Sequence, residues 1–92
     1  MRITDKILSA QIDFLNKKTN NALSPASKIN DKLIWNIGNY HLSFYDSFVS
    51  LHQISNDSGG VSEICPSCTR KELYKFIQGM LLGLDRKGKL NL

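Results

Sequence analysis

Residues 69–84, Thr-Arg-Lys-Glu-Leu-Tyr-Lys-Phe-Ile-Gln-Gly-Met-Leu-Leu-Gly-Leu, give the strongest structural signal in this sequence. The spacing of Thr69 and Glu72 is that of a capping box, in which the two side chains accept hydrogen bonds from backbone N–H groups at the start of a helix. Apolar residues then recur on one helical face: Leu73, Phe76, Ile77, Met80, Leu81 and Leu84. The stretch predicts a long amphipathic helix that begins after Thr69, and Gly88 is placed to end it.

A second amphipathic helix is predicted near the N-terminus. Thr4 can cap it, and Asp5 lies where the helix dipole favours negative charge. Its apolar face consists of Ile7, Leu8, Ile12 and Leu15. The helix should end near Lys17–Lys18, before the turn-forming residues 19–21.

Between these helices, residues 33–54 show the alternation of strands. Leu33, Trp35 and Ile37 fall on one face, and so do Tyr40, Leu42 and Phe44. Gly38–Asn39 is compatible with either a tight turn or a bulge within one long strand, and residues 45–47 interrupt the pattern again. Two or three antiparallel strands are therefore expected.

Two segments without this periodicity are predicted to be connections. Residues 20–32 contain several loop-forming residues, although Ala26–Ile29 could form a short helical turn. Residues 55–68 are polar, contain Gly59–Gly60 and end in Cys65-Pro66-Ser67-Cys68, so we expect a loop there.

The order helix, sheet, helix predicts an α+β fold, in which a short antiparallel sheet of two or three strands is flanked by an N-terminal and a C-terminal amphipathic helix. A chain of 92 residues has enough apolar material for one core, so residues 1–92 are expected to form a single domain. Both helices should cover one face of the sheet, leaving the other face available for binding.

Charge and hydropathy exclude some classes of protein. Twelve basic and eight acidic residues give a net charge of +4, which rules out an acidic mimic of nucleic acid. The longest nearly continuous apolar stretch, Met80–Leu84, is far shorter than the roughly 20 residues of a membrane-spanning helix. The N-terminal residues also lack the pattern of a secretory signal, so we expect a cytoplasmic protein without membrane contact.

The residues most suited to chemistry are two cysteines and two histidines. Cys65 and Cys68 could share a metal or form a disulfide, and the helix that follows should lower a thiolate pKa. A structural zinc would require His41 and His52 as further ligands, and a redox site normally places such a pair early, in a βαβ unit. No carboxylate is placed by the sequence to orient either histidine. We therefore predict free thiols, structural histidines, no metal, no cofactor and no enzymatic activity.

A basic and aromatic surface is the remaining candidate site. Lysine and arginine neutralise phosphates, and exposed aromatic rings can stack on unpaired bases. The alternative is an ordinary solvated helix face beside core aromatics. The predicted residues for binding a partner or nucleic acid are Lys28, Lys32, Trp35, Tyr45, Lys71, Lys75, Arg86 and Lys87.

Three parts of the chain resemble a family of small phage and prophage proteins. They are residues 36–43 (Asn-Ile-Gly-Asn-Tyr-His-Leu-Ser), Leu51–His52 with residues 59–61, and residues 71–74 (Lys-Glu-Leu-Tyr) with Gly83–Leu84. The resemblance departs after Ser43, where glycines are expected and Phe44, Asp46 and Ser47 stand instead.

In size and charge the chain is also similar to phage anti-CRISPR proteins, particularly inhibitors of the type I-F surveillance complex. This resemblance implies a non-enzymatic protein in the host bacterial cytoplasm that binds Cas subunits, guide RNA or both. By occupying that surface it would block hybridisation of target DNA, without a small-molecule substrate. The alternative is a phage accessory protein that binds nucleic acid or regulates the host without a Cas partner.

Overall fold

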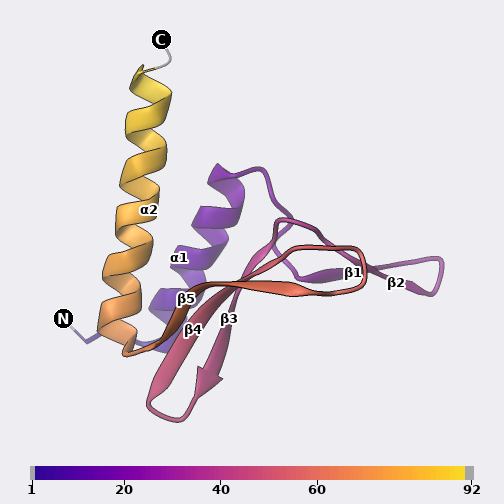
Figure 1. The fold of residues 1–92 in the computed structure, drawn as a ribbon, viewed down its shortest axis with the longest axis horizontal. Coiled ribbons are helices and arrows are strands. Elements are labelled where there is room, and N and C mark those ends of the chain that lie inside the picture. Colours follow the sequence, from indigo (N-terminus) through magenta and orange to yellow (C-terminus); the bar gives the residue numbers. More distant parts are fainter. Residues whose placement is uncertain (1, 91–92) are drawn as a thin grey trace.

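The computed structural model describes residues 2–90, with the side chains of residues 2–85. The chain forms helix α1 (Asp5–Lys18), strands β1 (Ala26–Ile29), β2 (Lys32–Trp35), β3 (Tyr40–Tyr45), β4 (Phe48–Ile54) and β5 (Val61–Cys68), and helix α2 (Arg70–Leu90) (Figure 1). The predicted α+β fold with a helix at each end is confirmed. The strands make two antiparallel sheets, one of order β1-β2 and one of order β3-β4-β5.

Both helices begin where the sequence predicts. Thr4 Oγ1 accepts a hydrogen bond of 3.2 Å from the Ile7 N–H. At the second helix, Glu72 Oε1 accepts from the Thr69 N–H at 2.9 Å and Thr69 Oγ1 accepts from the Glu72 N–H at 3.2 Å, which completes the capping box. The hydrogen bond from Thr69 also lowers the pKa of Glu72. The predicted end at Gly88 is wrong, because a glycine costs a helix only about 1 kcal/mol and α2 continues to Leu90.

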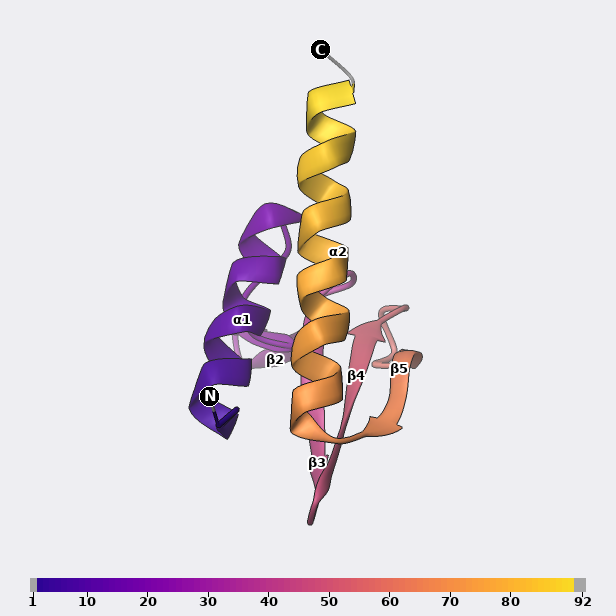
Figure 2. The same ribbon diagram turned by 90° about the vertical axis from the view of Figure 1, so that its left-hand side faces the viewer.

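The core lies between the three-stranded sheet and the two helices, which run side by side on the same face of that sheet (Figure 2). The two helices pack mainly on each other; on the sheet, α1 contacts β3, whereas α2 contacts β4 and β5. The apolar side chains that lose all their exposure come from both helices and from β4: Leu8, Leu15, Val49, Leu51, Leu73 and Ile77.

The loop predicted over residues 55–68 is wrong in its second half, because Val61–Cys68 form β5. β5 pairs with β4, but its register shifts between Val49 and Leu51 and again between Leu51 and His52. These irregularities remove the two-residue alternation by which a strand is recognised in a sequence. Pro66 lies within the first of them, where a missing N–H is tolerated.

The connection predicted over residues 20–32 is also wrong in part. Ala26–Ile29 form a strand rather than a helical turn, and β1 pairs with β2 around Asn30 and Asp31. Both turn residues have positive φ (50° and 62°), a conformation that asparagine and aspartate tolerate best among residues other than glycine. Gly38–Asn39 forms a turn that joins the two sheets, and the bulge is therefore excluded.

The molecule is flat, with principal extents of 43 × 42 × 20 Å. Figure 1 shows two parts that project from the body: the hairpin β1–β2 on one side and the last turns of α2, which continue past the end of α1. Within residues 2–90, no helix combines the length and apolarity needed to cross a membrane.

Candidate binding surface

The β1–β2 hairpin carries three exposed aliphatic residues. Leu33 retains 62% of its accessible surface, Ile29 52% and Ile34 44%. The hairpin forms a sheet of its own, and a two-stranded sheet has too little interior to bury such side chains. These three residues, with Lys28 and Lys32, are called the hairpin surface below.

Trp35 holds the base of the hairpin against the body. A Cβ atom added to Gly59 would lie only 2.5 Å from Trp35 Cε2, so the indole ring rests directly on the turn between β4 and β5. Asn36 secures the same region, since its N–H donates to the Pro25 carbonyl at 2.8 Å and its Nδ2 donates to Ser24 and Ser27. Trp35 is half-buried and acts as an anchor, while the exposed apolar side chains lie farther along the strands.

Two lysines accompany the apolar residues of the hairpin. In the register of the strands, Lys28 lies opposite Leu33, and Lys32 lies opposite Ile29. All four side chains are exposed. Because the side chains of neighbouring residues alternate between faces, each face of the hairpin presents one ammonium group beside apolar surface.

The other predicted binding residues lie elsewhere. Tyr45 is at the end of β3, beside the exposed rings of Phe44 and Phe48, and the Arg70 guanidinium is 5.7 Å from the centre of the Phe44 ring. Lys71 and Lys75 are exposed on α2, on the opposite side of the molecule from the hairpin (Figure 1). The side chains of Arg86 and Lys87 lie outside the described residues. The predicted set is therefore divided between two regions rather than gathered in one.

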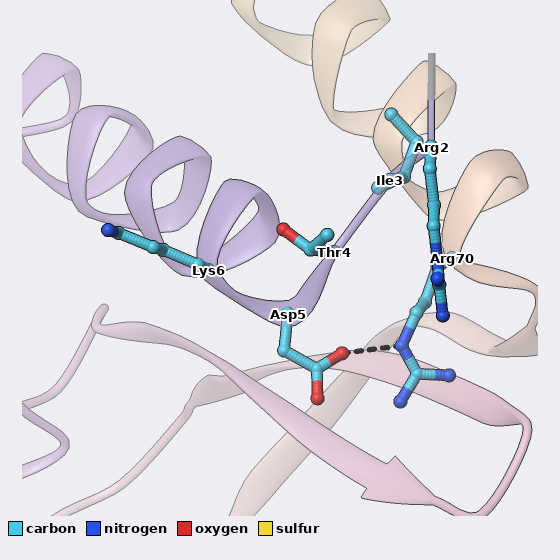
Figure 3. Close-up of a pocket in the computed structure, with 6 residues that line it drawn as sticks. All are labelled: Arg2, Ile3, Thr4, Asp5, Lys6 and Arg70. Carbon is cyan, nitrogen blue, oxygen red and sulfur yellow. Dashed lines mark hydrogen bonds and ion pairs between the residues drawn. The ribbon is translucent and has the colours of Figure 1, made fainter.

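A hollow of about 480 Å³ lies where the chain enters α1, near the start of α2 (Figure 3). Its lining includes three cations, Arg2, Lys6 and Arg70. Arg70 is paired with Asp5, and the hydrogen bond between them raises the pKa of Arg70. Since Asp5 places a negative charge in the hollow, its electrostatics are mixed, and it is a weaker candidate for binding an anion than its three cations suggest.

A polar network crosses the sheet face that the helices leave uncovered. His52 Nδ1 lies 3.3 Å from Ser43 Oγ, and His52 Nε2 lies 3.2 Å from Ser50 Oγ and 3.7 Å from Glu63 Oε2. His41 packs edge-on against His52, with ring centres 5.7 Å apart. Burial and, secondarily, the neighbouring His52 lower the pKa of His41.

The sequence places no carboxylate to orient either histidine, but the fold brings Glu63 of β5 beside His52. A sequence interpretation that treats residues 55–68 as a loop cannot find this pair. The network nevertheless resembles a cross-strand brace more than a nucleophilic site. Ser50 is only 1% exposed, and Ser50 and Glu63 approach the same nitrogen of His52.

The two cysteines are free thiols, with their sulfur atoms 3.8 Å apart. Burial and a hydrogen bond with Cys65 raise the pKa of Cys68 to about 11, so the expected lowering by the following helix is wrong. Both cysteines pack toward the core, whereas His41 and His52 belong to the polar network on the other face. Within the described residues, no group of three or more histidine, cysteine or acidic side chains could hold a metal ion.

Of these features, the hairpin surface combines the greatest exposure with mixed apolar and basic chemistry. The histidine network and the thiols are half-buried or buried, and the hollow beside α1 contains an internal ion pair. No protein-family model, curated protein or solved structure matches the chain.

Proposed function

We propose that this protein is a non-enzymatic binding protein that docks the hairpin surface onto a macromolecular partner. The observation that carries this proposal is the exposure of Leu33, Ile29 and Ile34 on a hairpin that no other element of the described chain covers. A soluble domain seldom groups such residues at one projecting point unless they meet a partner.

Docking at this surface has a clear driving force. Burying a large aliphatic side chain fully contributes about 1.5–3 kcal/mol, so Ile29 and Ile34 on one face of the hairpin, or Leu33 on the other, supply a substantial part of a typical affinity. Trp35 packs on Gly59 and holds the base of the hairpin in place, which limits the entropy lost on binding. Lys28 and Lys32 add attraction to phosphates or carboxylates at the rim of the contact.

The resemblance to phage anti-CRISPR proteins indicates the class of partner. We propose that the hairpin surface binds the type I-F surveillance complex in the host bacterial cytoplasm, on its Cas subunits, its guide RNA or both. The aliphatic side chains would pack on protein, and the two lysines would approach guide phosphates. A body 43 Å across, held there, would obstruct the pairing of target DNA with the guide.

A second candidate function is that of a phage accessory protein that binds nucleic acid without a Cas partner. It is favoured by the other predicted region, where Tyr45 is 52% exposed near the start of α2 and Lys71 and Lys75 are exposed along that helix. Aromatic rings beside basic residues suit single-stranded nucleic acid. Arg86 and Lys87 belong to the same helix and are expected to extend this region.

The test compares paired charge reversals in a pull-down with an assembled type I-F complex and with free RNA and DNA. If the first proposal is correct, Lys28→Glu with Lys32→Glu, and separately Leu33→Glu, abolish recovery of the complex. Lys71→Glu with Lys75→Glu is the matched control and leaves recovery unchanged. Salt-dependent recovery of free nucleic acid, lost only in the α2 variant, would favour the second candidate. Full recovery by all variants would exclude both surfaces.

A further inference from the structure

A side chain of α1 occupies part of the free edge of β3. Asn16 is fully buried, its Nδ2 donates to the Tyr40 carbonyl at 2.9 Å, and its Oδ1 accepts from the Tyr40 N–H at 2.8 Å. This pair of bonds is the one that a residue of a neighbouring strand would make. The backbone polar groups of Tyr40 therefore point away from β4, toward the edge of the sheet.

The direction of the backbone N–H and carbonyl groups of Tyr40 determines the direction of these groups along the rest of β3. The residue before it, Asn39, faces the other way, because its carbonyl accepts from the Ile54 N–H of β4 at 2.9 Å. Since backbone groups alternate along an antiparallel strand, His41 and Ser43 face β4, and Leu42 and Phe44 face the edge. In the described part of the chain β3 has a strand neighbour on one side only, so the outward groups of Leu42 and Phe44 have no strand to pair with.

A groove runs beside this open part of the edge. It has a volume of about 210 Å³ and lies between α1, which contributes Ile12 and Asp13, and β3, which contributes Leu42 and Phe44, with Leu23 also in its lining. Its surface is mainly apolar. It offers room for a large apolar side chain beside backbone groups that are ready to pair, which is the combination used when an extended peptide adds to a sheet.

The two edges of the three-stranded sheet differ in their protection. β5 carries Glu63, Pro66 and two register shifts, all of which hinder the pairing of a further strand. β3, with the sequence Tyr-His-Leu-Ser-Phe-Tyr, contains no acidic or lysine side chain and no proline, and its register with β4 is continuous. Only the β3 edge is therefore suited to receive another strand.

We infer that an extended segment of another protein adds to β3 as a fourth strand. Its backbone pairs with Leu42 and Phe44, an apolar side chain enters the groove, and a basic side chain two residues away approaches Asp13. The requirement for a basic residue follows from charge complementarity with this carboxylate. A second copy paired through its own β3, Tyr-His-Leu-Ser-Phe-Tyr, would bring no lysine or arginine side chain to Asp13 from that strand. This surface is separate from the hairpin surface, so the inference goes beyond the proposed function.

Hydrogen exchange of the free protein tests the geometry of the edge. The amides of Leu42 and Phe44 should exchange much faster than those of His41 and Ser43, which donate hydrogen bonds to β4. Equal protection of all four amides would overturn the orientation on which the inference depends.

Selection from a display library of nine-residue linear peptides tests the ligand. Enriched peptides should share an apolar and a basic residue two positions apart, and binding should protect the amides of Leu42 and Phe44. With Asp13→Lys as bait, the selected basic residue should be replaced by an acidic one. No enrichment, or enrichment unaffected by the charge at position 13, would overturn the inference.

Two substitutions at one position separate backbone pairing from side-chain loss. Phe44→Pro removes an outward N–H that β4 does not use, so the fold should survive while peptide affinity falls by about tenfold or more. Phe44→Val also removes the aromatic ring but keeps the N–H, so it should bind the peptide about tenfold or more tightly than Phe44→Pro. Equal binding by the proline and valine variants, or a dimer of the free protein that Phe44→Pro dissociates, would overturn the proposed occupant.

Discussion

The helix-covered sheet and the β1–β2 hairpin use similar residues for opposite purposes. In the body, Leu51 and Val49 alternate with polar residues along β4 and are fully buried beneath two helices. In the hairpin, Leu33 and Ile34 follow each other on opposite faces of β2, and both remain exposed. The difference lies in what covers the strands, because α1 and α2 pack on the three-stranded sheet and not on the hairpin.

This comparison separates the residues that stabilise the fold from those of the proposed binding surface. Burial of apolar surface stabilises the body, and each buried side chain contributes to one cooperative unit. The same side chains on the hairpin contribute little to folding and remain available to a partner. Substitutions in the body should therefore change the free energy of unfolding, whereas substitutions in the hairpin should change the affinity for a partner.

The largest expected effect is that of Leu51→Ala. Leu51 is fully buried at the centre of β4, and truncating such a residue costs about 2–5 kcal/mol through lost burial and the cavity that remains. Leu33→Ala, the matched change in the hairpin, should alter the free energy of unfolding by less than about 0.5 kcal/mol. Urea unfolding followed by circular dichroism measures both, and equal losses would contradict the division between body and hairpin.

Asn16→Ala should have the next largest effect and lower the free energy of unfolding by about 2 kcal/mol. The substitution leaves the Tyr40 N–H and carbonyl without their partners at a buried site, and an unsatisfied buried group costs about 1–3 kcal/mol. Ser9→Ala on the exposed side of the same helix is the control and should be neutral within about 0.5 kcal/mol. If Asn16→Ala is as harmless as the control, the amide does not hold the edge of β3.

Gly59→Ala tests the contact with Trp35 that links the body to the hairpin, and it should lower the free energy of unfolding by about 1–3 kcal/mol. Gly59 has φ of +85°, and its new methyl group would strike the Trp35 ring. Because Trp35 is the single tryptophan, its fluorescence should change as the hairpin is displaced. Gly79→Ala, in open space on α2, should instead stabilise the protein slightly, by up to about 1 kcal/mol. An unchanged emission spectrum in Gly59→Ala would mean that the indole does not anchor the hairpin.

The smallest effect concerns pH and the polar network. The pKa of His41 is lowered in the folded state, so the unfolded chain binds more protons as the pH falls through the ordinary histidine range. Stability should therefore be greatest above that range and decrease between about pH 7 and pH 5. His41→Gln should flatten this dependence in urea unfolding at several pH values. If the variant keeps the full dependence of the free energy of unfolding on pH, that dependence belongs to a titrating group other than His41.

The helices were predictable because their signals are local. Thr4 and Thr69 cap helices through contacts with residues three positions away, and the apolar faces follow from the helical period alone. The strand β5 was not predictable in the same way, since two register shifts conceal its alternation and its partner β4 is recognised only in three dimensions. Likewise, Asn30–Asp31 adopts a turn conformation that the sequence permits but does not enforce.

The candidate site was predicted only in part. Lys28 and Lys32 are exposed as expected. Alternation in residues 33–37 predicted a strand of the one helix-covered sheet, but the absence of a covering helix there depends on tertiary structure. The contact between Asn16 and Tyr40 joins residues 24 positions apart. No local pattern identifies such a pair, so the partly closed edge of β3 emerges only from the folded chain.

The irregular strand β5 limits how many molecules one sheet can recruit. A regular sheet with two open edges is bivalent and can propagate into a filament, because each added strand creates a new edge. Here Pro66 and the register shifts close one direction of growth, and Asn16 closes part of the other. Under the proposed strand addition, the three-stranded sheet therefore offers one edge to a partner, and the protein should titrate a partner strand in a one-to-one ratio.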